Sequence, residues 1–320
     1  MIARLLLVLS VASAFAGAAT AQSFPSRPLR VLPNSAAGTG PDLLSRVLAA
    51  KLQEAMGQPV VVENRPGANG NLAGELVARS PADGYTLMMA TDAQLTINPH
   101  VYAKQTFDWI KDLMPVAPIA TEAFKLVVSN EVPAKTVAEF IAYAKSVKKP
   151  LFYGSAGNGS QHHLTMEILK ERTGIELTHV PFKGGGAATA QALLSGEIQA
   201  TIGGAAVDGQ VKAGKLRALG ITSPTRSKRY PELPPIGDTV PGFQMVAWYG
   251  LFAPSGTPAE PVSRLRTEVS RALSQPDVQA KVNASGPEVW LASPEEFASA
   301  IRAGYERHGK IVKALGVTMD

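Results

Sequence analysis

The stretch LRVLPNSAAGTGPDLLSRVLAAKLQEAM, residues 29–56, holds the pattern from which the fold can be predicted. Leu29–Pro33 has the composition of a short buried strand. Asp42–Met56 has apolar residues at helical spacing, and we expect one buried stripe made of Leu43, Val47, Leu48, Leu52 and Ala55. A polar, glycine-rich loop joins the two segments. A strand, a loop and a helix in this order form the repeating unit of α/β folds.

The same alternation continues along most of the chain. Further strands are predicted at 60–63, 86–90, 126–129, 151–153, 177–181, 200–202, 218–222 and 250–253. Helices are predicted at 137–145, 160–172, 188–194 and 207–213, and after Ser255 at 259–273, 277–283 and 295–315. Glycine marks element ends, as at Gly57 and Gly174. This order predicts α/β architecture with mostly parallel sheets, and 320 residues favour two lobes over one.

The first residues have the pattern of an export signal. Arg4 precedes the apolar run Leu5–Val11, and Ala19-Thr20-Ala21 fits a cleavage site before Gln22. The apolar run is too short to span a bilayer, which takes about 20 residues. We therefore expect a signal peptide over residues 1–21 and a protein released into the periplasm. The chain has no cysteine, which rules out a lipobox anchor and disulfide bonds.

The charge and the motifs argue against several classes of function. The net charge is +5, and the cationic residues are scattered apart from Lys148-Lys149 and Arg226–Arg229, so no nucleic-acid-binding stripe is visible. No dinucleotide, Walker or nucleophile-elbow motif has its required spacing. His162 and His163 are adjacent, so on a helix they cannot bind one metal as an i, i+4 pair would. We expect no catalysis, no cofactor and no metal site.

Three polar segments follow predicted strands and are candidates for ligand binding. The first is the loop at 34–42, where Thr39 and Asp42 have the spacing of a capping box and the helix start offers free N–H groups to an anion. The second, at 153–160, repeats this arrangement before another helix. The third, at 91–96, leaves its strand at the carboxyl end, where parallel sheets bind ligands. A carboxylate at Asp42 would repel an anion unless its charge is already engaged.

A series of short phrases connects the chain to a known family. They include AGTGPD at 37–42, GQPVVVENRPGA at 57–68, DGYTL at 83–87, YGSAG at 153–157, KAGKLRAL at 212–219 and GLFAP at 250–254. In this order and over nearly the whole mature chain, they resemble the Bug receptors, the extracytoplasmic binding components of tripartite tricarboxylate transporters. One departure is the loop after Pro33, which is one residue longer than the family's usual Pro-Phe-x-Ala-Gly-Gly-x-x-Asp. A second is Ala93, where many relatives have serine.

The resemblance implies a periplasmic binding protein-like fold of type 2, with two α/β lobes and a cleft between them. The first lobe would comprise 22–125 and 245–320, and the second 126–244. A small carboxylate would bind in the cleft, mainly to backbone N–H groups, and the closed form would dock on the transporter's membrane permease. Carried onto this sequence, the contacts are Ser35, Ala36, Ala37, Gly38, Thr39, Asp92, Ala93, Ser155, Ala156, Gly157 and Ser160.

The residues leave three matters open. A receptor that hands its signal to a sensor kinase remains an alternative, which neighbouring genes would distinguish from uptake. The carboxylate is not identified, and Tyr153, Phe182 and Trp248 either line an aromatic site or pack in the core. A monomer is the plain expectation.

Overall fold

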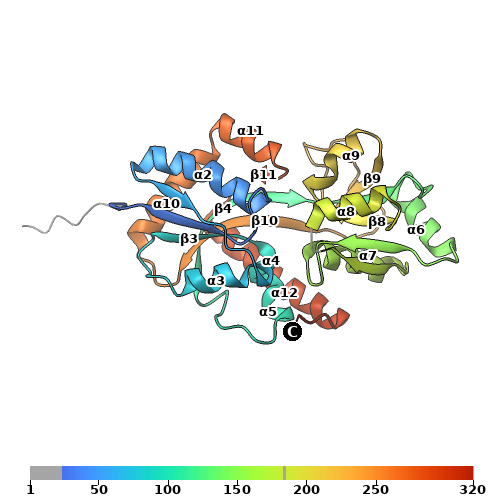
Figure 1. Cartoon of the computed structure of the whole chain (residues 1–320), viewed down its shortest axis with the longest axis horizontal. Coiled ribbons are helices and arrows are strands. Elements are labelled where there is room, and N and C mark those ends of the chain that lie inside the picture. The colour runs from blue at the N-terminus through green and yellow to red at the C-terminus, as the bar shows by residue number, and fades with distance from the viewer. Residues whose placement is uncertain (1–23, 183–184, 320) are drawn as a thin grey trace, which may run out of the picture.

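The computed structural model describes residues 24–182 and 185–319, and it contains two β-sheets flanked by helices (Figure 1). The predicted signal peptide lies outside these residues. Within them, no helix is both long and apolar enough to cross a membrane. The two sheets lie at opposite ends of an elongated molecule, so the chain forms two lobes.

Six strands form the sheet of the first lobe, in the order β11-β4-β10-β3-β1-β2. The strands are β1 (Leu29–Pro33), β2 (Val60–Val62), β3 (Thr86–Thr91), β4 (Leu113–Ala123), β10 (Val246–Pro254) and β11 (Glu288–Val289). β1 pairs in parallel with β2 and β3, whereas β10 is antiparallel to β3 and β4, and β11 is antiparallel to β4. The sheet is therefore mixed, and the prediction of mostly parallel sheets is wrong.

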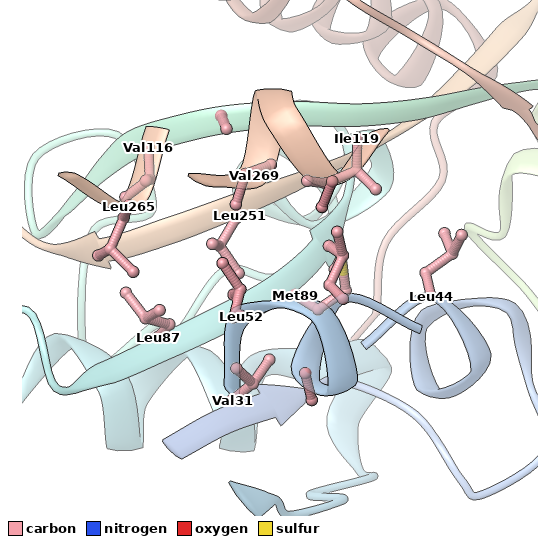
Figure 2. Close-up of a cluster of buried hydrophobic side chains, with 14 of the residues drawn as sticks. Val31, Leu44, Leu52, Leu87, Met89, Val116, Ile119, Leu251, Leu265 and Val269 are labelled. Carbon is pink, nitrogen blue, oxygen red and sulfur yellow. The ribbon is translucent and has the colours of Figure 1, made fainter. Parts of the chain in front are cut away.

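Helices cover both faces of this sheet. They are α2 (Gly40–Met56), α3 (Asn71–Ala78), α4 (Asp92–Thr96), α5 (Asn98–Val101), α10 (Ala259–Leu273), α11 (Pro276–Ala284) and α12 (Pro294–Leu315). Leu44 and Leu52 of α2 belong to the same buried cluster as Leu87 and Met89 of β3 and Leu265 of α10 (Figure 2). Leu48 and Leu52 are buried as predicted, but Leu44 and Met56 complete the stripe in place of Leu43, which is 38% exposed, and Ala55, which is also exposed.

The second lobe has its own five-stranded sheet, in the order β7-β6-β8-β5-β9. Its elements are β5 (Lys125–Ser129), α6 (Val137–Ser146), β6 (Phe152–Ser155), α7 (Gln161–Thr173), β7 (Thr178–Pro181), α8 (Gly185–Leu194), β8 (Ala200–Gly203), η2 (Ala205–Val207), α9 (Asp208–Lys212) and β9 (Leu216–Ile221). β6 is parallel to β7 and β8, and β5 is antiparallel to β8 and β9. Phe140 and Tyr153 are fully buried in its core.

The chain passes between the lobes at two neighbouring points. β4 ends at Ala123 in the first sheet and β5 begins at Lys125 in the second, so Phe124 is the first crossing. The return precedes β10, and Thr222 ties the crossings together: it accepts a hydrogen bond from Phe124 N at its hydroxyl and one from Met245 N at its carbonyl, both 2.8 Å. This geometry supports the proposed lobe boundaries near residues 125 and 245.

The C-terminal helix α12 also connects the lobes. His308 is fully buried on the first lobe, where its Nδ1 lies 2.8 Å from the Thr96 hydroxyl. The last turns reach the second lobe, because Ile311 packs on that lobe's core and Leu315 joins an apolar cluster with Leu164 of α7. α12 therefore contacts both halves of the molecule, although its residues were expected in the first lobe alone.

Candidate ligand-binding site

The loop between β1 and α2 differs from the predicted capping box. The Thr39 hydroxyl makes no cap bond to the helix; it donates to the Ala36 carbonyl at 2.6 Å and lies 2.6 Å from the Ser35 hydroxyl. Asp42 instead accepts from Gly38 N at 2.8 Å, because Gly38 has a positive φ of 83° that folds the loop back over the helix start. The loop is thus held by its own side chains.

The charge of Asp42 is engaged within the first lobe, as the anion-binding hypothesis requires. Arg46, one turn later, donates to its Oδ1 at 3.0 Å. Burial would raise the pKa of Asp42, but the bonds from Arg46 and Gly38 outweigh it and lower that pKa. Among the described residues, the N–H groups of Ser35, Ala36 and Ala37 donate to no protein acceptor. Because Ala36 and Ala37 are exposed, these groups are free for a ligand.

The second-lobe loop begins α7 as predicted. Ser160 is the N-cap, and its hydroxyl accepts from His163 N at 3.3 Å. Gly157 N donates to the Ser155 hydroxyl at 3.1 Å, and Gly159 N donates to Nδ1 of His163 at 3.2 Å. The N–H groups of exposed Ala156 and Asn158 are left without a protein acceptor within the described part of the chain.

The Ser155 hydroxyl has a partner that the sequence did not indicate. It lies 2.6 Å from Nε2 of His179, and the His179 ring stacks against Tyr153 and His163, whose ring centroids are 4.9 and 4.1 Å away. Burial, and after it the neighbouring His163, lower the pKa of His179 to about 4, so the ring is neutral near pH 7. Ser155 and Ala156 also line a hollow of about 10 Å³ with His162, which suits about one water molecule.

The third segment forms the helix α4 and lies against the second lobe. Asp92 and Ala93 are 1% and 8% exposed. Oδ2 of Asp92 accepts from Nε2 of Gln161, the first residue of α7, at 2.6 Å. Burial raises the pKa of Asp92 to about 7, opposed by the backbone at Trp248 and the charge of Arg307. Asp92 and Gln161 therefore form a direct contact between the lobes.

Contacts connect the three predicted segments in a chain, from the first to the third and from the third to the second. A side chain at Gly70 would lie 3.0 Å from both Asn34 and Gln94, which places the first and third segments side by side on the first lobe. Gln161 then connects the third segment to the second-lobe loop. Tyr153 and Trp248 are core residues, 0% and 6% exposed, and so follow the packing alternative.

Two residues near the first loop were missed. Tyr249 places its hydroxyl 2.9 Å from where a Cβ at Gly40 would stand, and it donates to Oε2 of Glu122 at 2.6 Å. Oε1 of Glu122 accepts from Ala205 N of the second lobe at 3.3 Å. Burial raises the pKa of Glu122, opposed by the Tyr249 bond. No local signal marked Glu122, because its strand was not predicted.

Comparison with known proteins gives a consistent result. Residues 44–317 match the model of the tripartite tricarboxylate transporter family receptor. The chain is 31% identical to protein BugT of Bordetella pertussis, over 99% of this chain and 98% of that protein. R. palustris Rpa4515 with adipate superposes with a TM-score of 0.84 at 34% identity, covering 92% of this chain and 99% of that one. MatC from Rhodopseudomonas palustris with bound malate gives 0.79 at 31%, covering 90% and 100%.

Proposed function

Because the chain belongs to the tripartite tricarboxylate transporter receptor family, whose members are solute-binding receptors and not enzymes, we propose that it captures a small carboxylate in the periplasm for a membrane transporter. The resemblance to the Bug receptors seen in the sequence is confirmed, as is the two-lobed α/β fold. We propose an acid similar to adipate or malate, because one of the two related structures is with adipate and the other has malate bound.

One observation carries this proposal: among the described residues, backbone N–H groups without a protein acceptor occur before a long helix in each lobe. They belong to Ser35–Ala37 before α2 and to Ala156 and Asn158 before α7. Helix starts carry a partial positive charge that favours anions. Neither loop contains Lys or Arg, and Asp42 is already paired, so the site would hold a carboxylate with neutral donors.

The energetics suit capture and release. Hydrogen bonds to a charged group contribute about 1.5–3 kcal/mol each, and they must offset the desolvation and ordering of the ligand. A net of about −8 kcal/mol corresponds to micromolar affinity. We propose that Ser35–Thr39, Asp92 and Ala93 contact the acid from the first lobe, and Ser155–Gly157 and Ser160 from the second.

The two crossings between the lobes suggest how the protein would work in transport. We propose that residues 1–21 direct export and are removed, and that the mature chain has no lipid anchor because it has no cysteine. The monomer closes its lobes about Phe124 and Met245 when the acid binds. The closed form then delivers the acid to the transporter's permease.

A thermal-shift screen tests the proposal. Purified residues 22–320, unfolded and refolded to remove carried-over ligand, are mixed with adipate, malate, citrate and glutamate, each beside its uncharged amide. An acid at 100 times its Kd adds about 2.7 kcal/mol of stability, which raises Tm by about 5 °C. The expected result is a shift with an acid and none with its amide. Equal shifts with both, or none with any acid, would contradict the assignment.

A further inference from the structure

Three adjoining hollows run along the outer side of the lobe junction. The first, about 310 Å³, is lined by residues of both lobes, among them Thr121, Arg226, Lys228 and Glu288. The second, about 450 Å³, shares Lys228 and Glu288 with it and continues to Leu291. The third, about 260 Å³, shares Leu291 and ends at Arg266 of α10. We call these hollows together the edge furrow, because they follow β11, the outermost strand of the first-lobe sheet.

The edge furrow is separate from the ligand cleft. Thr121 and Ala123, which line it, flank Glu122 in β4. None of the residues proposed to contact the acid lines these hollows. In Figure 1, β11 and α11 of the first lobe lie on the same side of the molecule as α9 of the second.

The edge furrow carries a net positive charge. Its cations are Arg226, Lys228, Arg229 and Arg266, and its carboxylate is Glu288. The guanidiniums of Arg226 and Arg266 each donate to a backbone carbonyl, at Pro231 and Val116, and neither pairs with a carboxylate among the described residues. Within the described residues Lys228 forms no ion pair. Of the four, Arg229 is the one paired with a carboxylate, that of Asp208 at 3.3 Å.

An apolar strip accompanies these cations. Leu291 is 54% exposed, among the most exposed large apolar residues of the described chain. Val289 and Trp290 beside it are partly buried, and β11 pairs with β4 on one side only. Arginine and exposed apolar side chains in a concave surface are characteristic of protein contacts, and a free strand edge can accept an extended segment.

We propose that the edge furrow docks an extended segment of another protein, rich in acidic residues and carrying at least one apolar side chain. The positive charge selects the acidic residues, and Leu291 receives the apolar one. A second copy of this chain fits less well, because its net charge of +5 would meet a cationic surface. A small polyanion would leave Leu291 and the third hollow unused.

The position of the furrow gives the contact a role. Arg226–Tyr230 belong to the second lobe, whereas Glu288–Leu291 belong to the first. The affinity for a segment bound across both groups would therefore depend on the relative orientation of the lobes. If the proposed function holds, the segment belongs to the membrane component of the transporter. The docking itself does not depend on that function.

Fluorescence anisotropy with defined peptides tests the proposal without any acid present. The probe is a labelled peptide Glu-Leu-Glu-Glu-Val-Glu-Leu-Glu, and the control peptide has Gln at every Glu. The receptor is the mature chain, its R226E/K228E variant, its L291D variant, and a charge-matched K148E/K149E variant at the lysine-lined groove of the second lobe. Circular dichroism and the acid-induced thermal shift verify that each variant is folded, and the latter reports separately on the proposed function.

We expect the acidic peptide to bind the parent chain, and R226E/K228E to weaken binding at least about tenfold, as expected for lost opposite charges. L291D should also weaken it, whereas K148E/K149E should stay within about twofold. Any of four results would overturn the proposal: an equal loss in K148E/K149E, equal binding of the Gln peptide, no binding of the acidic peptide, or displacement by inorganic triphosphate at equal charge concentration. Sedimentation showing a dimer that R226E/K228E dissolves would assign the furrow to self-association instead.

Discussion

Replacing Asp92 with asparagine should stabilise the protein most at alkaline pH and change its stability little below pH 3.8. Asp92 is 1% exposed, and burial raises its pKa to about 7 from an unfolded value of 3.8. A raised pKa means that the folded state favours the protonated acid. The stability that this proton contributes is fully present below pH 3.8 and is lost as pH rises through 7. Asparagine has the shape of the protonated acid and can still accept from Gln161.

The magnitude follows from the two pKa values. Each unit of difference is worth about 1.4 kcal/mol, so the advantage of D92N over the parent should grow to about 4 kcal/mol at pH 8. At pH 5 the same relation gives about 1–2 kcal/mol. Urea unfolding at 25 °C, followed by circular dichroism at both pH values, should therefore show the difference between D92N and the parent rising by about 2–3 kcal/mol.

Asp42 provides a matched control of opposite sign. It is also buried at a helix start, but the bonds from Arg46 and Gly38 lower its pKa. Its charge contributes stability that is present above pH 3.8 and lost as pH falls. D42N should therefore be less stable than the parent at pH 5 and pH 8, by about 1–3 kcal/mol at each. A D92N difference that does not change with pH, or a loss of stability at pH 8, would refute this account of Asp92.

Three further predictions concern packing and closure. Gly74→Ala should lower the free energy of unfolding in urea by about 1–3 kcal/mol, because the added Cβ would lie 2.5 Å from Phe107 and Trp109. Gly209→Ala has open space around it and should raise that free energy by about 0.5–1 kcal/mol, so the reverse order would contradict the packing described. Gln161→Leu should lower the free energy of unfolding at pH 7 by about 1–3 kcal/mol, because it removes the hydrogen-bond donor of Asp92 Oδ2. Unchanged stability would show that this contact does not form. Small-angle scattering should show a smaller radius of gyration when an acid found in the thermal screen is added, and an identical radius would argue against closure.

The sequence was informative where a local pattern determines structure. β1 and α10 have the predicted bounds, and Gly57 and Gly174 end their helices in the left-handed conformation. β4 was missed because its sequence LMPVAPIATEA contains two prolines, which cannot donate to a ladder. The structure accommodates Pro115 and Pro118 at two register shifts against β10. Because β4 was not predicted, neither its antiparallel pairing nor the role of Glu122 could be predicted.

The candidate site shows the same division. The loops themselves could be recognised, because glycine, hydroxyl residues and a following helix are local features. Their partners could not: Gln161 bonds to a residue 69 positions away, and Tyr249 and Glu122 are 127 positions apart. The capping box failed for a related reason, since Asp42 has a better donor in Gly38 once the loop folds back. Long-range contacts of this kind follow from the topology of the two sheets.

The attachment of α12 to both lobes has a consequence for the lifetime of a bound solute. His308 is fixed on the first lobe, while Ile311 and Leu315 pack on the second, and Met319 N donates to the Val101 carbonyl at 2.7 Å. Opening of the lobes would separate these apolar side chains from their neighbours, and exposing apolar surface to water costs free energy. If the lobes open as proposed, the contacts at the end of this helix add to the barrier for release of the solute. A membrane partner that loosens the last two turns would shorten the residence time without touching the solute.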